Sequence, residues 1–171
     1  MRGAAEQCSS WPYRTGMISR SGRIAADDLE AVAELLTDVL EERGTWCNLV
    51  FEPVEDHEGA EDSALFSFLA ARGPSNPFAT IMAGDDGKRS SSAQVGIQHR
   101  AGTKAAAQLR EEELFLPEGA RVRQDHPRRG LVVEWPTDSN VATLVGWLLP
   151  AMRLLGRAPT TNSILYEWHH A

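Results

Sequence analysis

Hydrophobic residues recur at helical spacing over residues 26–43. Acidic residues crowd the first turn of this segment, where they favour the helix dipole, and Gly44 follows it as a C-terminal cap. Positions i, i+3, i+7, i+10 and i+11 form one apolar stripe. The stripe consists of Leu29, Val32, Leu36, Val39 and Leu40. This pattern predicts an amphipathic helix that packs on a core.

Two further segments, residues 103–114 and 138–155, also have helical spacing. Thr103 is expected to cap the first of these helices with its hydroxyl group. The second helix carries a long apolar stripe, within which Pro150 predicts a kink or a split after Leu149. The stripe consists of Val141, Leu144, Val145, Leu148, Met152 and Leu155.

Alternation with period two predicts strands in other parts of the chain. Within residues 45–54, one face of the expected strand is apolar, formed by Cys47, Leu49 and Phe51. Residues 63–72 suit either a short helix or a strand, and propensity favours the helix. Further strands are expected at residues 77–83 and 93–99, followed by a hairpin over residues 120–135.

These elements predict an α+β fold with a single, mainly antiparallel sheet and packed helices. If residues 63–72 form a strand and one neighbour is minor, the order is close to α-β-β-β-α-β-β-α. That order resembles the type III secretion chaperone-like fold, which also gives small acidic dimers. The resemblance implies a protein or peptide partner and a homodimer. Residues 96–99 and 124–132 are also similar to small hypothetical proteins of GC-rich actinobacteria, a likeness that implies no function.

The chain of 171 residues is long enough for one domain with a real core. Residues 1–23 are rich in Ser, Gly and Arg and are expected to be disordered or loosely attached, with Met17 as an alternative start. Residues 24–158 form the expected α+β domain. Residues 159–171 are expected to be a tail that lies on the core or serves an interface.

Charge separates the chain into two parts. The net charge is −7, which argues against a nucleic-acid-binding protein, because duplex binding needs a basic footprint. Between Ile24 and Leu65 there are 13 acidic residues and a single basic one, whereas residues 100–129 are slightly basic. This asymmetry supports self-association or a basic partner, and a solvated acidic helix face is the alternative. Five Trp residues also suit an interface.

The composition gives no sign of a metal centre, a cofactor or a membrane span. Cys8 and Cys47 form neither a disulfide framework nor a metal-binding pair. His57 lies in an acidic loop, and His169 and His170 are expected to be disordered at the chain end. No signal peptide and no run of 18 apolar residues is present. We expect a cytoplasmic protein without metal or cofactor.

Residues 124–130 concentrate charge in a tight reversal between two expected strands. Pro127 fixes φ and Gly130 permits a positive φ, which predicts a short hairpin loop. An anionic ligand could bind here, between forked guanidinium groups and the N–H groups at the start of the 103–114 helix. The alternative is a solubilising turn in which Asp125 pairs locally with Arg128. The candidate ligand-binding residues are His99, Arg100, Asp125, His126, Arg128 and Arg129.

Acid/base catalysis would use His99 or His126 together with Asp125. Asp125 and His126 are adjacent and would point to opposite faces of a strand, which argues against acid/base catalysis by this pair. No nucleophile elbow or phosphate-binding loop is present, and no catalytic residue is assigned. The sequence therefore favours a non-enzymatic module that binds a protein or peptide. The alternative is a small-molecule (anion or carboxylate) binding protein or an acid/base enzyme, with its site at His99 and the 125–130 hairpin.

Overall fold

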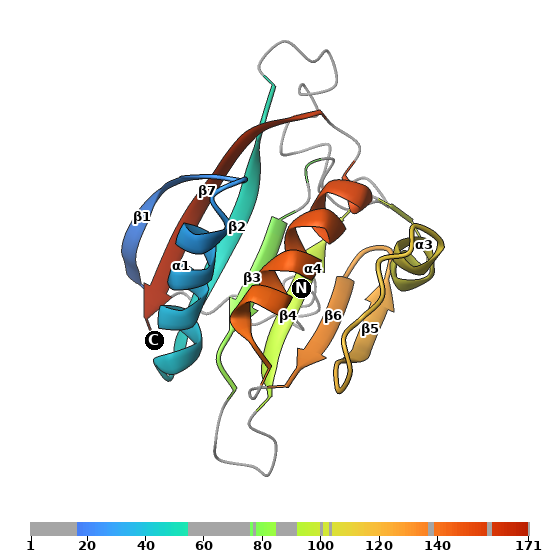
Figure 1. Cartoon of the computed structure of the whole chain (residues 1–171), viewed down its shortest axis with the longest axis horizontal. Helices are drawn as coiled ribbons and strands as arrows, with labels where there is room; N and C mark the ends of the chain where they lie inside the picture. The colour runs from blue at the N-terminus through green and yellow to red at the C-terminus, as the bar shows by residue number, and fades with distance from the viewer. Residues whose placement is uncertain are drawn as a thin grey trace, which may run out of the picture.

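A single antiparallel sheet of seven strands carries three helices in the described part of the chain (Figure 1). The computed structural model describes residues 17–54, 76, 78–84, 92–99, 101–102, 104–136, 139–156 and 159–170. The elements in chain order are β1 (Met17–Ala25), α1 (Leu29–Glu41), β2 (Thr45–Pro53), β3 (Phe78–Met82), β4 (Ala93–Gln98), α3 (Ala105–Glu111), β5 (Arg121–His126), β6 (Gly130–Trp135), α4 (Val141–Leu155) and β7 (Thr160–His170).

The strand order across the sheet is β1-β7-β2-β3-β4-β6-β5, and every neighbouring pair is antiparallel. From α1 to α4 the described elements follow the order α-β-β-β-α-β-β-α. The predicted α+β fold with one antiparallel sheet and packed helices is therefore confirmed. β1 and β7 are additional strands on the β2 side of this sheet.

The helix predicted over residues 26–43 is confirmed as α1, and its ends are set by local residues. The Asp28 side chain accepts a hydrogen bond from the Ala31 amide at 3.1 Å, which satisfies one free donor of the first turn. Gly44 follows the helix with φ of 74°, a conformation that suits glycine. The buried face consists of Val32, Leu35, Leu36 and Val39.

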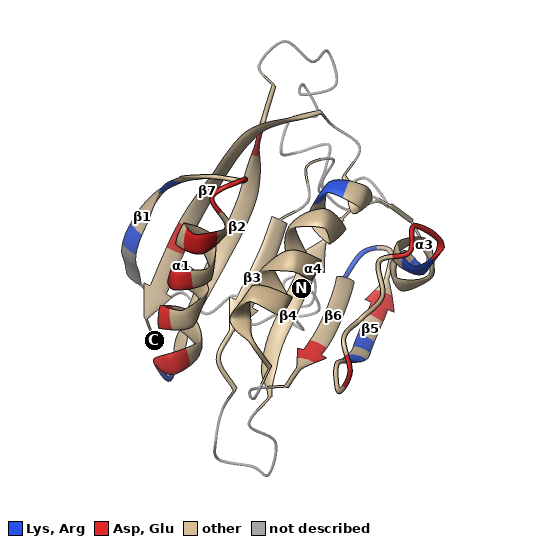
Figure 2. Cartoon of the chain, viewed as in Figure 1, with Lys and Arg blue, Asp and Glu red and all other residues tan. Residues whose placement is uncertain are grey.

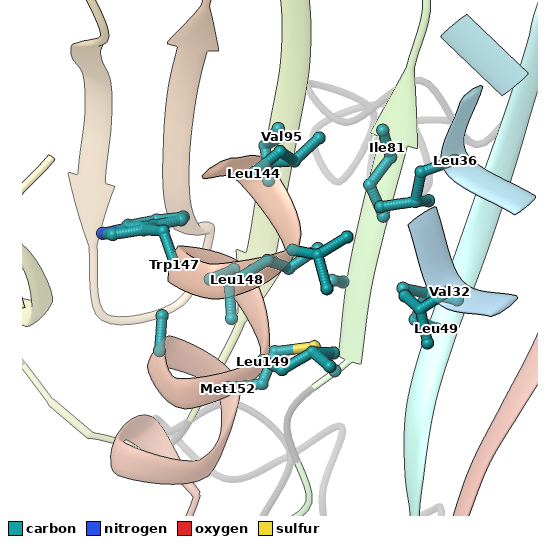
Figure 3. Close-up of a cluster of buried hydrophobic side chains, with 14 of the residues drawn as sticks. Val32, Leu36, Leu49, Ile81, Val95, Leu144, Trp147, Leu148, Leu149 and Met152 are labelled. Carbon is teal, nitrogen blue, oxygen red and sulfur yellow. The ribbon is translucent and has the colours of Figure 1, made fainter. Parts of the chain in front are cut away.

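The core lies between the sheet and the two longer helices, which cover the same face (Figures 1 and 3). Val32 and Leu36 of α1 face Leu49 and Ile81 of the sheet, as Figure 3 shows. In α4, Leu144 and its neighbours on the same stripe lie over β3 and β4. The apolar face of β2 is formed by Cys47, Leu49 and Phe51 as predicted, and all three are buried.

The expected split of the last helix at Pro150 is wrong, because α4 continues through this residue to Leu155. Proline removes the N–H that would bond the carbonyl four residues earlier, at Gly146. Both Gly146 and Pro150 are exposed, and a Cβ at Gly146 would meet no atom within 4 Å. The missing hydrogen bond therefore lies on the exposed face of α4 rather than on its core face. The helix begins at Asn140, whose side chain accepts from the Ala142 amide.

The predicted limits of the domain are too narrow at both ends. Residues 17–23, expected to be loosely attached, belong to β1, and residues 160–170, expected to be a tail, form β7 between β1 and β2. His169 and His170, expected to be disordered, lie in β7. The period-two pattern of Ile164, Tyr166 and Trp168 in this strand supplies side chains that are buried in the core or packed against it. That alternation was the signal for a strand.

Several predictions fall outside the described residues. These are the helix or strand over residues 63–72, the acidic loop with His57, Thr103, and the segment 1–16. None of the described helices is both long and apolar enough to cross a membrane.

Candidate functional site

The predicted site lies at one corner of the sheet, where the end of β4 meets α3 and the β5–β6 turn. Register places Ile97 opposite Leu131 and His126 opposite Gly130, so the turn lies beside the end of β4. Gly130 has φ of 79°, as the hairpin prediction required. A Cβ at Gly130 would overlap the Ile97 carbonyl oxygen and lie 3.2 Å from Cα of Gln98. Only glycine permits this approach, which brings the turn next to His99.

Asp125 points towards α3 because a β-bulge interrupts the alternation of β5. Strict alternation would place Arg123 and Asp125 on the same face of β5, but the register shifts between Val122 and Gln124 and separates them. Arg123 instead pairs with Glu134 of β6 at 2.7 Å. The predicted hairpin is confirmed, but its side chains do not alternate strictly along β5.

The carboxylate of Asp125 caps α3. It accepts hydrogen bonds from the amides of Ala105 and Ala106, each at 3.0 Å. Lys104, the residue before the helix, has φ of 65° and contributes no capping side chain. The N–H groups that were expected to bind an external anion therefore already hold a carboxylate of the same chain. Among the described residues, no ion pair joins Asp125 to Arg128.

His99 is buried at the end of β4, with 1% of its surface exposed. Its Nδ1 accepts a hydrogen bond from the Ala101 amide at 3.2 Å, so the neutral ring carries its proton on Nε2. Nε2 is buried and has no hydrogen-bond partner among the described residues. Burial lowers the pKa of His99, and the nearby negative charge of Asp125 acts in the opposite direction.

The other candidate residues lie on the outside of the turn. His126, Arg128 and Arg129 are exposed, and the Nδ1 atom of His126 accepts from the Arg128 amide at 3.1 Å. In Figure 2 the backbone of this turn is coloured blue for arginine, whereas several positions along α1 are coloured red for Asp and Glu. Arg100 lies outside the described residues. The structure thus brings His99 and Asp125 together at the start of α3 and leaves the other three described candidates at the surface.

An apolar groove adjoins this corner, and the sequence analysis did not find it. Its volume is about 230 Å³, and α3, the following loop, β5, β6 and α4 contribute to its walls. Phe115 and Val122 line it although 63% and 40% of their surfaces are exposed. The lining residues are Ala106, Leu109, Arg110, Leu114, Phe115, Leu116, Val122, Leu131 and Trp147.

The groove escaped sequence analysis because no single segment forms it. A signal was nonetheless present, since Leu114, Phe115 and Leu116 are three consecutive apolar residues beyond the end of α3. In the folded protein Leu114 and Leu116 pack against the core, whereas Phe115 between them is exposed.

No family model, curated protein or solved structure matches this chain. In the residues that the structure describes, no group of three or more His, Cys, Asp or Glu side chains could hold a metal ion. The geometry of this corner is therefore the basis for a functional assignment.

Proposed function

We propose that this protein is a non-enzymatic module that binds a protein or peptide through the groove between α3, β5 and α4. The observation that carries the proposal is an apolar groove with two exposed hydrophobic residues, Phe115 and Val122, among its walls. Exposed apolar side chains that cluster at a hollow are typical of interaction sites, whereas single ones are ordinary.

The size of the groove favours a side chain of a larger partner over a free small molecule. Sites for drug-sized ligands have volumes of roughly 300–1,000 Å³. The groove, with about 230 Å³, is below that range. Protein interfaces commonly place one or a few anchoring side chains in pockets of this kind, and those anchors carry most of the binding energy.

The polar residues of the corner give less support to catalysis. Both oxygens of the Asp125 carboxylate are bonded to α3, and the ring of His99 is buried. A general base must reach the proton that it removes, but His99 is buried, and the carboxylate of the half-buried Asp125 already accepts from two backbone amides.

Selection of peptides from a random displayed library on the full-length protein tests the proposal. Selected peptides should lose binding to Val122→Asp and Phe115→Asp variants, because a carboxylate in the groove disfavours an apolar anchor. Leu154→Asp is the matched control, since Leu154 is an exposed apolar residue that does not line the groove. Peptides that bind all three variants equally would contradict the proposal.

The alternative function, binding of an anion or carboxylate at the hairpin, has one observation in its favour. The Nε2 atom of His99 is a buried donor without a partner among the described residues. If it binds such a ligand together with Arg128 and Arg129, phosphate or carboxylates should raise the melting temperature, by linkage. Replacing both arginines with Gln should remove that gain. If the arginines only solubilise the turn, each replacement should change stability by no more than about 0.5 kcal/mol.

Self-association and a cytoplasmic location belong to the same proposal. The free thiol of Cys47 is buried and suits a reducing compartment. Sedimentation velocity of the wild type and of Val122→Asp tests whether a second copy occupies the groove. A dimer that the substitution dissociates would identify the occupant as another copy of this chain, in the manner of small dimeric chaperones.

A further inference from the structure

The groove contains one charged side chain, and that charge is positive. Arg110 lies in the last turn of α3, is exposed and makes no ion pair among the described residues. No Asp or Glu lines the groove. Glu111, Glu112 and Glu113 follow Arg110 and are exposed, but none of them lines the groove or forms an ion pair with Arg110 among the described residues.

The groove also contains a buried hydrogen-bond donor. Trp147 extends from α4 across β6 with its ring nitrogen at the far end, away from the main core (Figure 3). The Nε1 atom of this indole is buried and has no hydrogen-bond partner among the described residues. Trp135 packs against the ring, with 5.8 Å between centroids and 43° between planes, and so helps to fix its position.

The indole of Trp147 and the guanidinium of Arg110 require different partners. An indole N–H only donates, so it needs an acceptor such as a carbonyl oxygen. A guanidinium presents a planar fork of donors that matches a carboxylate. An apolar hollow flanked by one neutral donor and one cation is therefore complementary to an apolar group that has an acceptor and an anion beside it.

We infer that the partner is a polypeptide segment with an apolar anchor residue and an acidic side chain within about two positions of it, a spacing set by the reach of neighbouring side chains. The anchor fills the groove, a backbone carbonyl accepts from Nε1 of Trp147, and the acidic side chain pairs with Arg110. This inference rests on the proposed function, because it assigns chemistry to the occupant of that groove.

Sequencing the peptides that the full-length protein selects from a random library tests this chemistry. The enriched sequences should combine an apolar residue with Asp or Glu within two positions. Selection on Arg110→Glu should instead enrich Lys or Arg beside the apolar residue. Lys104→Glu is the matched control, because it reverses a charge before the same helix without touching the groove, and it should select the wild-type sequences.

Two measurements on a selected peptide, synthesised with an amidated C-terminus, check the individual contacts. The indole N–H resonance of Trp147, assigned by its loss in Trp147→Phe, should move to higher proton frequency when the peptide binds. Trp147→Phe and Arg110→Gln should each weaken binding by about tenfold, which corresponds to one ordinary hydrogen bond or ion pair. The effect of Arg110→Gln should diminish at high salt.

The outcomes separate this inference from the proposed function. Peptides that require an intact groove but show no acidic preference overturn the inference and leave the function standing. Peptides that bind only with a free C-terminal carboxylate also overturn it, because the anion would then come from a chain end. Failure to select any groove-dependent peptide overturns both.

Discussion

The helices α1 and α3 pack on the same protein but are specified in different ways. α1 has 13 residues, its own capping side chain at Asp28 and a glycine with positive φ just beyond its end. α3 has seven residues, and the side chain that satisfies its first amides comes from Asp125 on β5, some 20 positions later. Four residues of α1 are buried in the core, against two of α3.

This difference shows that α1 is specified by nearby residues, whereas α3 depends on residues far away in the sequence. Isolated helices shorter than about 12 residues are marginal, so α3 depends on its tertiary contacts. The groove depends on them too, because Leu109 and Arg110 of α3 form part of its wall. A bulge in β5 directs Asp125 to α3 and thus helps to shape a groove that no local sequence pattern predicts.

Gly130→Ala should have the largest effect on the α3 corner. The new methyl group would overlap the Ile97 carbonyl, and φ of 79° is unfavourable for alanine. We expect a loss of about 3 kcal/mol or more in the free energy of unfolding, measured by urea denaturation. Gly102→Ala is the matched control, since Gly102 also has a positive φ, of 92°, but an added Cβ would meet nothing within 4 Å. It should cost only about 1 kcal/mol. Equal losses would show that close packing at Gly130 is unimportant.

Asp125→Ala should destabilise the protein by about 2–3 kcal/mol, because two amides of α3 lose a charged acceptor. Asp28→Ala removes a single, exposed cap from α1 and should cost about 1 kcal/mol. Asp125→Asn keeps an acceptor without the charge and should fall between the two. Urea denaturation gives all three values.

Amide hydrogen exchange adds a local readout to this pair. Exchange in α3 should accelerate in Asp125→Ala, whereas exchange in α1 should change little. If Asp28→Ala proves the more damaging substitution, or if α3 keeps its protection without Asp125, the contrast between the two helices is wrong.

The sequence revealed the elements whose signals are local. The helix α1, the alternation of Cys47, Leu49 and Phe51, and the turn at Gly130 each depend on one short segment, and each is confirmed. Of the stripe predicted for α1, Leu29 is exposed, and Leu35 is buried in addition to Val32, Leu36 and Val39. The strand β7 was missed although Ile164, Tyr166 and Trp168 alternate within it, because this short signal lies near the chain end, where a tail was expected.

The candidate site was only partly predictable for the same reason. His99 and the hairpin turn both lie at strand ends, which local sequence signals predict, and the structure places them at the same corner of the sheet. The direction of Asp125 depends on the bulge, and the groove depends on five segments that meet only in the folded chain. Neither property has a periodic signal in the sequence.

The burial of His99 should make the stability of the α3 corner depend on pH. Burial lowers the pKa of His99, so the folded state binds fewer protons than the unfolded state, in which histidine titrates near 6.5. Its contribution is therefore present above that value and is lost as pH falls below it, towards the lowered pKa. One proton changes the free energy of unfolding by at most about 1.4 kcal/mol per pH unit.

His99→Asn isolates this contribution, because the amide oxygen can still accept from the Ala101 amide. Urea denaturation from about pH 8 to about pH 5 spans the range in which histidine titrates. The wild type should lose stability relative to the variant as the pH falls. His126→Asn, which removes an exposed imidazole that also accepts from a backbone amide, is measured in the same series. A difference between wild type and His99→Asn that is constant with pH would contradict the assignment.

The smallest effect is expected at the ion pair that joins β1 to α1. Arg20 pairs with Asp38 at 2.7 Å, but the two side chains are 44% and 56% exposed, so solvent screens their attraction. Arg20 also lies over the ring of Trp168 at 5.0 Å, and Arg20→Gln would remove both interactions. A double-mutant cycle of Arg20→Gln and Asp38→Asn isolates the pair, and we expect a coupling energy of about 0.2–1 kcal/mol that decreases with salt. A coupling energy well above this range would show that α1 also depends on a distant charged residue, as α3 depends on Asp125. The two helices would then differ in length but not in their dependence on tertiary contacts.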